Sequence, residues 1–237
     1  MDSEIILLVG TAASAGFLHT LFGPDHYLPF IMMGSARKWT RRKTLTITLL
    51  CGVGHIAGSV ILGLIGVAAG LALNKMVGIE SFRGELAGWL LLSFGLVYML
   101  WGLRQAWRDR PHKHWHAHAD GVVHTHEHTH HGEHAHVHEK QGKAGVTPWA
   151  LFIIFVLGPC EVLIPLLMVP AAQHSVTGLL LVTSVFGLTT LATMVAAVLA
   201  GMVGVRLLPV TRLQRYAHAL AGGAICLCGV AMQFLGL

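Results

Sequence analysis

Residues 19–33, HTLFGPDHYLPFIMM, decide the fold, because they place two histidines, an aspartate and two prolines inside an apolar run. Proline removes its own N–H and collides with the carbonyl four residues back. Pro24 therefore frees the carbonyl of Thr20, and Pro29 frees that of Asp25. A freed carbonyl at membrane depth is tolerated only where protein, water or a ligand satisfies it. The stretch predicts a broken transmembrane helix whose break faces a polar interior.

The rest of the chain has the composition of an integral membrane protein. Of its 237 residues 54% are hydrophobic and 11% are charged, which argues against a water-soluble domain. A helix needs about 20 apolar residues to cross the hydrocarbon, and long uninterrupted runs favour helices over barrel strands. We predict an all-α membrane protein with six transmembrane helices, at residues 5–33, 45–73, 86–107, 149–172, 178–205 and 213–235. The start, MDSEIILLVG, lacks a basic region, so we predict no cleaved signal peptide.

Basic residues predict the orientation of these spans. The first loop carries five of them, Arg37, Lys38, Arg41, Arg42 and Lys43. By the positive-inside rule this loop is cytoplasmic, and six spans then put both termini outside. The predicted location is the bacterial inner membrane. Topology explains the formal net charge of +5, so we infer no nucleic-acid partner.

An internal repeat extends the argument to the second half of the chain. GPDHYLPFIMM in the first span aligns with GPCEVLIPLLM in the fourth at an offset of 135 residues, and this pairs Asp25 with Cys160 and His26 with Glu161. Three spans per half make the repeats inverted, an arrangement in which transporters build a midplane site from discontinuous helices. We predict a first three-helix repeat at 1–107, a loop at 108–146 and a second repeat at 147–237, with helices 1 and 4 broken at proline.

Ionisable side chains mark the predicted interior. A carboxylate at the centre of a membrane helix costs at least about 2.5 kcal/mol on insertion scales, so such residues indicate function. The candidates for binding substrate are His19, Asp25, His26, His55, Cys160 and Glu161. Imidazole and carboxylate suit nickel, cobalt or zinc, whereas copper(I) favours more sulfur.

Three simpler interpretations stay open. The prolines and glycines kink tightly packed helices, His55 makes an interhelical hydrogen bond, and Cys160 packs as a small hydrophobe. The four cysteines form no CxxC pair, so neither a disulfide framework nor a zinc ribbon is predicted.

The predicted loop holds twelve of the seventeen histidines, mixed with acidic residues. This composition cannot bury a core, so we expect disorder without a ligand, and its neutral imidazoles suit divalent transition metals. A pH-sensing or merely solvating role is the alternative. The candidate loop ligands are His112, His114, His116, His118, His124, His126, His128, His130, His131, His134, His136 and His138.

These motifs resemble a known family. The first-span histidines and aspartate, the six spans and the histidine-rich loop look like NicO-type nickel/cobalt transporters and the UreH-like membrane proteins. The paired proline elements are similar to those of CcdA-type thiol transporters and the wider LysE-like group. The resemblance implies nickel or cobalt transport and points to His19, Asp25 and His26, then to Cys160 and Glu161.

Two departures from these families concern spacing and thiol chemistry. Five residues separate His19 from Asp25, where the nickel/cobalt permeases have four. The repeat also pairs Cys160 with Asp25, so a dithiol relay lacks its second cysteine.

The function predicted from these residues is transport of a divalent transition metal, nickel or cobalt before zinc, by a non-enzyme without a permanent cofactor. Export is favoured, because a cytoplasmic chelating loop collects excess ions. The alternatives are a membrane metallochaperone or metalloenzyme-assembly factor and a LysE-like exporter of anions or sulfur compounds. Expected partners are the lipid bilayer and the metal ion, with a homo-oligomer or a cytoplasmic metal-handling protein as the protein partners that the sequence allows.

Overall fold

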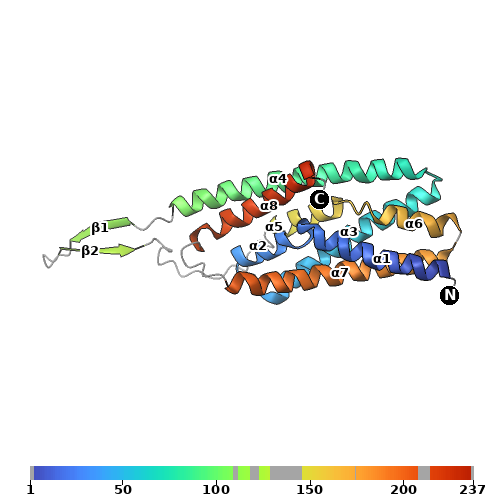
Figure 1. Cartoon of the computed structure of the whole chain (residues 1–237). Helices are drawn as coiled ribbons and strands as arrows, with labels where there is room; N and C mark the ends of the chain where they lie inside the picture. Colours follow the sequence, from blue (N-terminus) through green and yellow to red (C-terminus); the bar gives the residue numbers. More distant parts are fainter. Residues whose placement is uncertain are drawn as a thin grey trace.

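The computed structural model of the chain describes residues 3–108, 112–117, 123–128, 146–173, 175–207 and 214–235. Figure 1 shows an elongated bundle of helices that run along one axis, with a two-stranded hairpin at one end. Within the described residues, five helices are long and apolar enough to cross a membrane by length and composition. They are Glu4–Phe22, Arg41–Ala68, Leu73–Arg108, Val176–Val205 and Gln214–Leu235.

The first predicted span is a broken helix, as expected. Helix α1 (Ser3–Phe22) stops at Gly23, the short 3-10 helix η1 (Pro24–His26) follows, and α2 (Leu28–Ala36) continues the path. The N–H of Gly23 donates to the carbonyl of His19 at 3.0 Å, whereas Pro24 has no N–H with which to continue the helix. The predicted break is therefore confirmed.

The fourth predicted span is also broken. It consists of α5 (Val146–Leu157) and α6 (Leu163–Ala172), separated by residues 158–162. Helices of 12 and 10 residues are each shorter than the hydrocarbon is thick. The described chain thus holds five long candidate spans and one divided segment where six spans were predicted.

The remaining helices are α3 (Arg41–Ala68), α4 (Leu73–Arg108), α7 (Val176–Leu207) and α8 (Ala217–Leu235), the last preceded by the 3-10 helix η2 (Gln214–Tyr216). The predicted start of the third span at residue 86 is wrong, because α4 begins at Leu73. Charged residues interrupt the apolar run before residue 86, but Glu80 and Arg83 pair one helical turn apart, at 2.7 Å. The pairing allows the helix to continue through them.

Close backbone contact joins α4 to α8. A Cβ added at Gly95 would collide with the backbone of Cys226, and one added at Gly229 would collide with the backbone of Leu92. Small residues allow membrane helices to approach in this way. Helix α1 packs along α7, and α3 packs against α5, α6 and α7. The core between them is apolar and includes Phe30, Met33, Phe155, Met194 and Ile225.

The histidine-rich segment contains two strands, β1 (His112–Ala117) and β2 (Val123–His128), paired antiparallel with His112 opposite His128. The sequence predicted disorder without a ligand here; the strands follow from residues that alternate with period two and include valine, threonine and tryptophan, which favour strands. The side chains of the strand histidines and the candidates His118, His130, His131, His134, His136 and His138 lie outside the described part.

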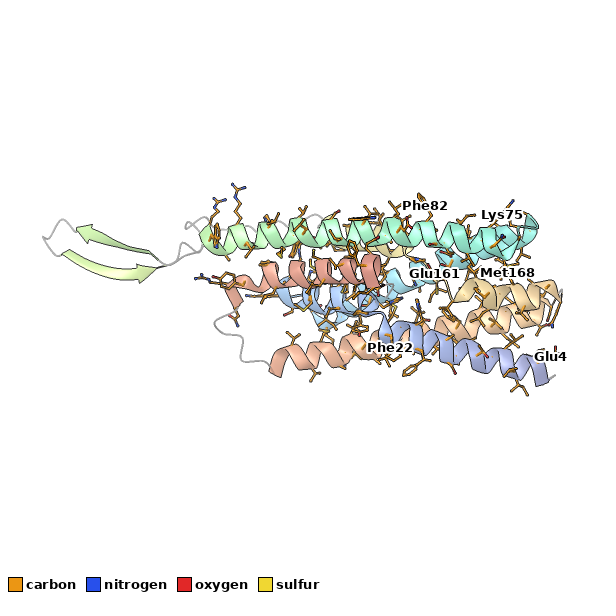
Figure 2. All side chains as sticks on the ribbon, turned by 45° about the horizontal axis from the view of Figure 1, so that its top comes forward. Glu4, Phe22, Lys75, Phe82, Glu161 and Met168 are labelled. Carbon is orange, nitrogen blue, oxygen red and sulfur yellow. The ribbon has the colours of Figure 1, made fainter. Side chains whose placement is uncertain are left out.

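The two helix breaks lie about midway along the bundle. In Figure 2, Glu4 and Lys75 lie toward one end, whereas Phe22 and Glu161, which flank the two breaks, lie in the middle. The turn between α2 and α3 lies at the opposite end, where the hairpin follows α4. The fold thus brings both breaks to the same depth of the bundle.

Candidate metal centre

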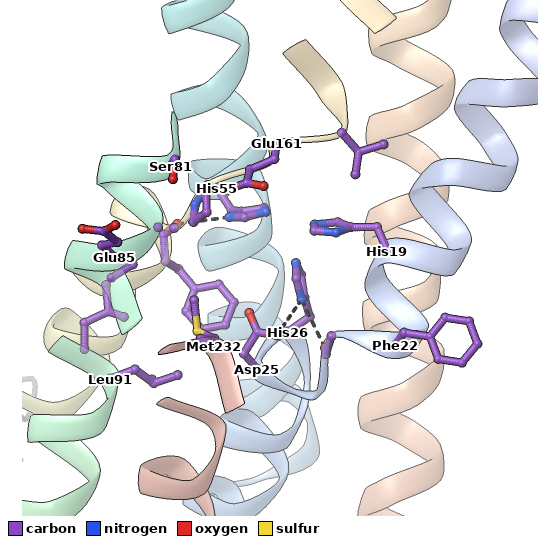
Figure 3. Close-up of a pocket in the computed structure, with 18 of the residues that line it drawn as sticks. His19, Phe22, Asp25, His26, His55, Ser81, Glu85, Leu91, Glu161 and Met232 are labelled. Atoms are coloured by element: carbon purple, nitrogen blue, oxygen red, sulfur yellow. Dashed lines mark hydrogen bonds and ion pairs between the residues drawn. The ribbon is translucent and has the colours of Figure 1, made fainter. Parts of the chain in front are cut away.

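Three histidines from three elements meet at the first break. His19 lies near the end of α1, His26 ends η1 and His55 lies in the middle of α3. One ring nitrogen from each lies within 4.8 Å of the other two. The ring centroid of His26 lies 4.7 Å from that of His19 and 5.1 Å from that of His55. Figure 3 shows the three rings converging, because the break turns His26 back toward α1.

Hydrogen bonds fix which nitrogen each of two rings presents. The Nδ1 of His26 lies 3.1 Å from the Gly23 carbonyl and 3.2 Å from Oδ1 of Asp25. The Nδ1 of His55 lies 3.3 Å from the Phe155 carbonyl. A carbonyl or a carboxylate accepts only, so Nδ1 donates in both rings and Nε2 keeps its lone pair in the neutral imidazole.

The Nε2 atoms of His19, His26 and His55 are all buried, and within the described structure none has a hydrogen-bond partner. An unsatisfied buried polar atom costs about 1–3 kcal/mol and is uncommon in folded proteins. Three such atoms on converging rings are the arrangement expected of a ligand site. Three nitrogens bound to one tetrahedral ion at about 2.1 Å lie about 3.4 Å apart, so ring nitrogens that lie within 4.8 Å of one another need to approach by up to about 1.4 Å to hold a metal.

Asp25 contacts His26 on the ring nitrogen opposite its free Nε2. Its carboxylate bonds the Nδ1 of His26, and the two side chains are only 17% and 4% exposed. A carboxylate on the far nitrogen of a histidine orients the ring and raises its basicity as a metal ligand. Gly23 leaves room for the pair, because a Cβ there would lie 2.6 Å from Nδ1 of His26 and 2.9 Å from Oδ1 of Asp25.

The second break orients His55. Pro159 has no N–H, and the sequence predicts that it frees the carbonyl of Phe155. That carbonyl accepts from the ring of His55 at 3.3 Å and from the N–H of Gly158 at 3.1 Å. The backbone of the second break therefore completes the site built at the first.

A cavity of about 640 Å³ opens beside the histidines. Its polar lining includes His19, Asp25, His26, His55, Glu85 and Glu161, and its apolar lining includes Phe22, Leu91, Phe155 and Met232. Glu161, whose side chain is exposed, lies on the cavity wall outside the group of three ring nitrogens. Five of the six residues predicted from the sequence thus line one cavity.

The structure places Cys160, the sixth predicted residue, elsewhere. Its side chain is fully buried in an apolar cluster with Ala12, Leu163 and Phe186. Its backbone N–H donates to Oγ of Ser59 at 3.1 Å. The thiol packs, which is the simpler of the two interpretations that the sequence allowed.

Sequence reasoning missed a polar network behind the second break. One guanidinium nitrogen of Arg83 donates to Oε2 of Glu80 at 2.7 Å, and the other donates to the carbonyls of Val156 at 2.9 Å and Gly158 at 3.3 Å. The signal was a pair of opposite charges three residues apart, a helical spacing. The predicted span began after them, so they counted as part of a loop.

Fold and site together define a helical membrane protein with two broken segments and a histidine cluster at their meeting point. The sequence matches the family described as "Cytochrome C biogenesis protein transmembrane region" over residues 27–231, so the chain belongs to that family. This description names neither nickel nor cobalt.

A plant protein shares part of the sequence. "Chloroplast protein FOR GROWTH AND FERTILITY 2" of Arabidopsis thaliana is 32% identical over 109 residues, which are 45% of this chain and 27% of the relative. The chain thus matches only about a quarter of that protein's length. No solved structure matches the chain.

Proposed function

We propose that the protein transports a divalent transition-metal ion, nickel or cobalt before zinc, through the cluster formed by His19, His26 and His55. The observation that carries the proposal is the convergence of three histidine rings, each with a buried and unpartnered Nε2, beside a cavity midway along a membrane bundle. Neutral imidazole suits these metals. Three ligands leave a further coordination position open, which favours exchange over permanent retention.

The proposal includes an inverted repeat of two three-helix halves. The first half comprises α1 to α4 and the second α5 to α8, and α1 and α5 start from opposite ends of the bundle. The contacts follow the same symmetry. Helix α1 of the first half packs on α7 of the second, and the segments α5 and α6 of the second half pack on α3, the first-half counterpart of α7. In this proposal α5 and α6 together form the sixth span. Inverted repeats with broken helices are the architecture of alternating access around a midplane site.

The proposed orientation places the hairpin end in the cytoplasm. The basic turn between α2 and α3, the end of α4 and the start of α8 lie at that end, and they carry Arg37, Lys38, Arg108 and Arg215. This distribution follows the positive-inside rule. The N-terminus then faces outward across the bacterial inner membrane, whereas the end of α8 lies about midway along the bundle (Figure 1). Export is the proposed direction, because a cytoplasmic histidine-rich segment is placed to collect excess ions.

The family admits thiol chemistry as a competing interpretation, and the cysteines argue against it. All four, Cys51, Cys160, Cys226 and Cys228, are free. A relay between the two breaks needs a thiol at each, but Asp25 occupies the position that pairs with Cys160. The resemblance to NicO-type transporters therefore describes the site better than the resemblance to thiol transporters.

Flux into proteoliposomes tests the proposal. Wild type and His55→Ala are reconstituted, and entry of nickel, cobalt and zinc is followed with a metal-sensitive dye, with sulfite as a control anion. We expect metal flux in wild type and its loss in the variant, because His55 supplies one of three ligands. Sulfite movement without metal flux would instead establish an anion exporter.

The twelve histidines between His112 and His138 favour a second candidate, a membrane factor that loads metal onto an enzyme. Deleting residues 112–138 separates the two functions. A transporter keeps its flux with altered affinity or regulation, because its site lies between the helices. A loading factor loses its function outright.

A further inference from the structure

Glu80 is a fully buried carboxylate within a candidate membrane-spanning helix. Its relative exposure is 0%, and only one of its oxygens is bonded: Oε2 accepts from Arg83, while Oε1 is buried and has no partner among the described residues. Ionisable residues inside a membrane bundle are costly and mark function. An unpartnered oxygen is also what a carboxylate needs in order to take up a proton.

Arg83 links this carboxylate to the second break. Besides Glu80, it donates to the carbonyls of Val156, in the last turn of α5, and of Gly158, just after that helix, and it lies 3.4 Å from Oγ of Ser59. A guanidinium at the negative end of a helix is favourable. Arg83 therefore shares its hydrogen bonds between the Glu80 carboxylate on α4 and the carbonyls at the end of α5. A change in the charge of Glu80 alters how strongly Arg83 bonds those carbonyls.

The end of α5 in turn contacts the histidine cluster. The carbonyl of Phe155 accepts from Nδ1 of His55, and a Cβ on Gly158 would lie 3.2 Å from that same Nδ1. A chain of direct contacts thus runs from Glu80 through Arg83 and the second break to one of the three metal ligands. Glu80 itself is not a member of the ligand group.

Among the described residues, few other titratable groups face Glu80. They are Arg83 on its own helix, and Cys160 and Glu161 in the segment between α5 and α6. Helix α3 presents Ser59, which is uncharged, and α6 carries no titratable side chain. The neighbouring α4 residues Ser81 and Gly84 line the histidine cavity, so the helical turn that carries Glu80 borders that cavity.

From this arrangement we infer that Glu80 is the proton-binding site of the transporter and that its proton is exchanged for the metal ion. The inference rests on the proposed transport function and adds its coupling ion. The carboxylate takes one proton on Oε1 from one side of the membrane and releases it to the other as the site changes access. One proton moving against one divalent cation offsets one of the two charges moved. When Glu80 is neutral, Arg83 bonds the carbonyls at the end of α5 without competition from a carboxylate. This changes the position of the Phe155 carbonyl that accepts from the ring of His55.

Paired dyes in proteoliposomes test the inference. A metal-sensitive dye and a pH-sensitive dye report metal and proton movement in wild type, Glu80→Gln and the control Glu4→Gln, which changes a carboxylate at the far end of the bundle. Because Glu80 is not a ligand, we expect Glu80→Gln to bind nickel, cobalt and zinc within about threefold of wild type, as independent sites do. Its metal-driven proton signal should fall at least about tenfold, a coupling change of ordinary size. Glu4→Gln should match wild type in both signals.

Each outcome has a defined meaning. A proton signal in Glu80→Gln equal to that of wild type overturns the inference, as does wild-type metal flux with no proton movement, and both leave the transport function intact. An absence of wild-type metal flux overturns the transport function and this inference with it. If Glu80→Gln fails to fold because Arg83 is left unpaired, the charge-neutral variant Glu80→Gln/Arg83→Gln replaces it, with the same expected loss of the proton signal.

Discussion

The two helix breaks share a sequence pattern but carry different chemistry. At the first break, GPDH, the side chains of Asp25 and His26 turn into the cavity, where His26 joins the histidine cluster and Asp25 accepts from its ring. At the second, GPCE, the side chain of Cys160 packs into an apolar cluster, and the backbone carbonyls are held by Arg83 and His55. The first break thus contributes a side chain to the histidine cluster, and the second contributes backbone that supports the cluster. The variants below test this division, from the largest expected effect on metal binding to the smallest.

Replacing His26 by alanine should have the largest effect. It removes one of three Nε2 ligands and leaves Asp25 without its partner. We expect metal affinity to fall by at least about 100-fold, beyond the usual loss of a supporting partner. Titration calorimetry of purified protein with nickel, cobalt and zinc measures it. His218→Ala is the control, because His218 bonds Tyr98 at 2.8 Å away from the cavity lining. Equal metal affinity in the two variants would show that the metal does not bind at the first break.

Asp25→Asn should have the next largest effect. The amide removes the charge that orients and polarises His26, and loss of such a partner lowers metal affinity about 10- to 100-fold. Glu161→Gln makes the matched change at the second break. Because Glu161 lies outside the three-nitrogen group, its variant should lose only about threefold, within the range of independent sites. If the two effects were reversed, Glu161 would be the ligand and Asp25 a bystander.

Alanine at the glycine of each break compares the two directly. A Cβ at Gly23 would lie 2.6 Å from Nδ1 of His26, whereas one at Gly158 would lie 3.2 Å from Nδ1 of His55. We expect Gly23→Ala to weaken metal binding about tenfold, the low end of losses from misplaced ligands, and Gly158→Ala to weaken it less. Gly10→Ala controls for the substitution, because nothing lies within 4 Å of its Cβ. Equal binding curves for Gly23→Ala and Gly10→Ala would contradict the tight fit at the first break.

Arg83→Gln should change stability more than binding. It leaves Glu80 as a buried, unpaired charge and releases the end of α5, a loss of about 3–5 kcal/mol for a broken buried pair. Thermal unfolding in detergent measures this loss, and calorimetry should show a smaller change in metal affinity than Asp25→Asn produces. Lys75→Gln, an exposed change on the same helix, should leave both quantities as in wild type. An unchanged melting temperature in Arg83→Gln would show that the network does not hold the second break.

Cys160→Ala should have the smallest effect on metal. Its thiol packs with apolar side chains, so we expect metal affinity within about twofold of wild type, as for distant sites. Cys51→Ala is the matched control, because Cys51 is also buried, at 1% exposure. A large loss of affinity in Cys160→Ala alone would make the thiol a ligand and the two breaks chemically alike.

Several elements of this structure were readable from residue patterns. Glycine–proline pairs at an offset of 135 residues predicted both helix breaks, because proline cannot continue a helix hydrogen bond. Costly ionisable groups in apolar runs singled out His19, Asp25 and His26, and the structure places all three beside one cavity. The start of α4 was missed, because an apolar-run criterion ends at charges and does not register that Glu80 and Arg83 neutralise each other.

The sequence alone determined that the chain lies in a membrane, where its helices break, and which residue types lie at those breaks. Only the tertiary structure decided which of these residues meet. His55 is 29 residues from His26, and its approach depends on how α3 packs against α5. Cys160 and Glu161 are adjacent in the chain, yet one packs into an apolar cluster and the other lines the cavity. Side-chain direction at a break follows from irregular backbone geometry and from the neighbours that satisfy freed carbonyls, and no helical period in the sequence encodes either.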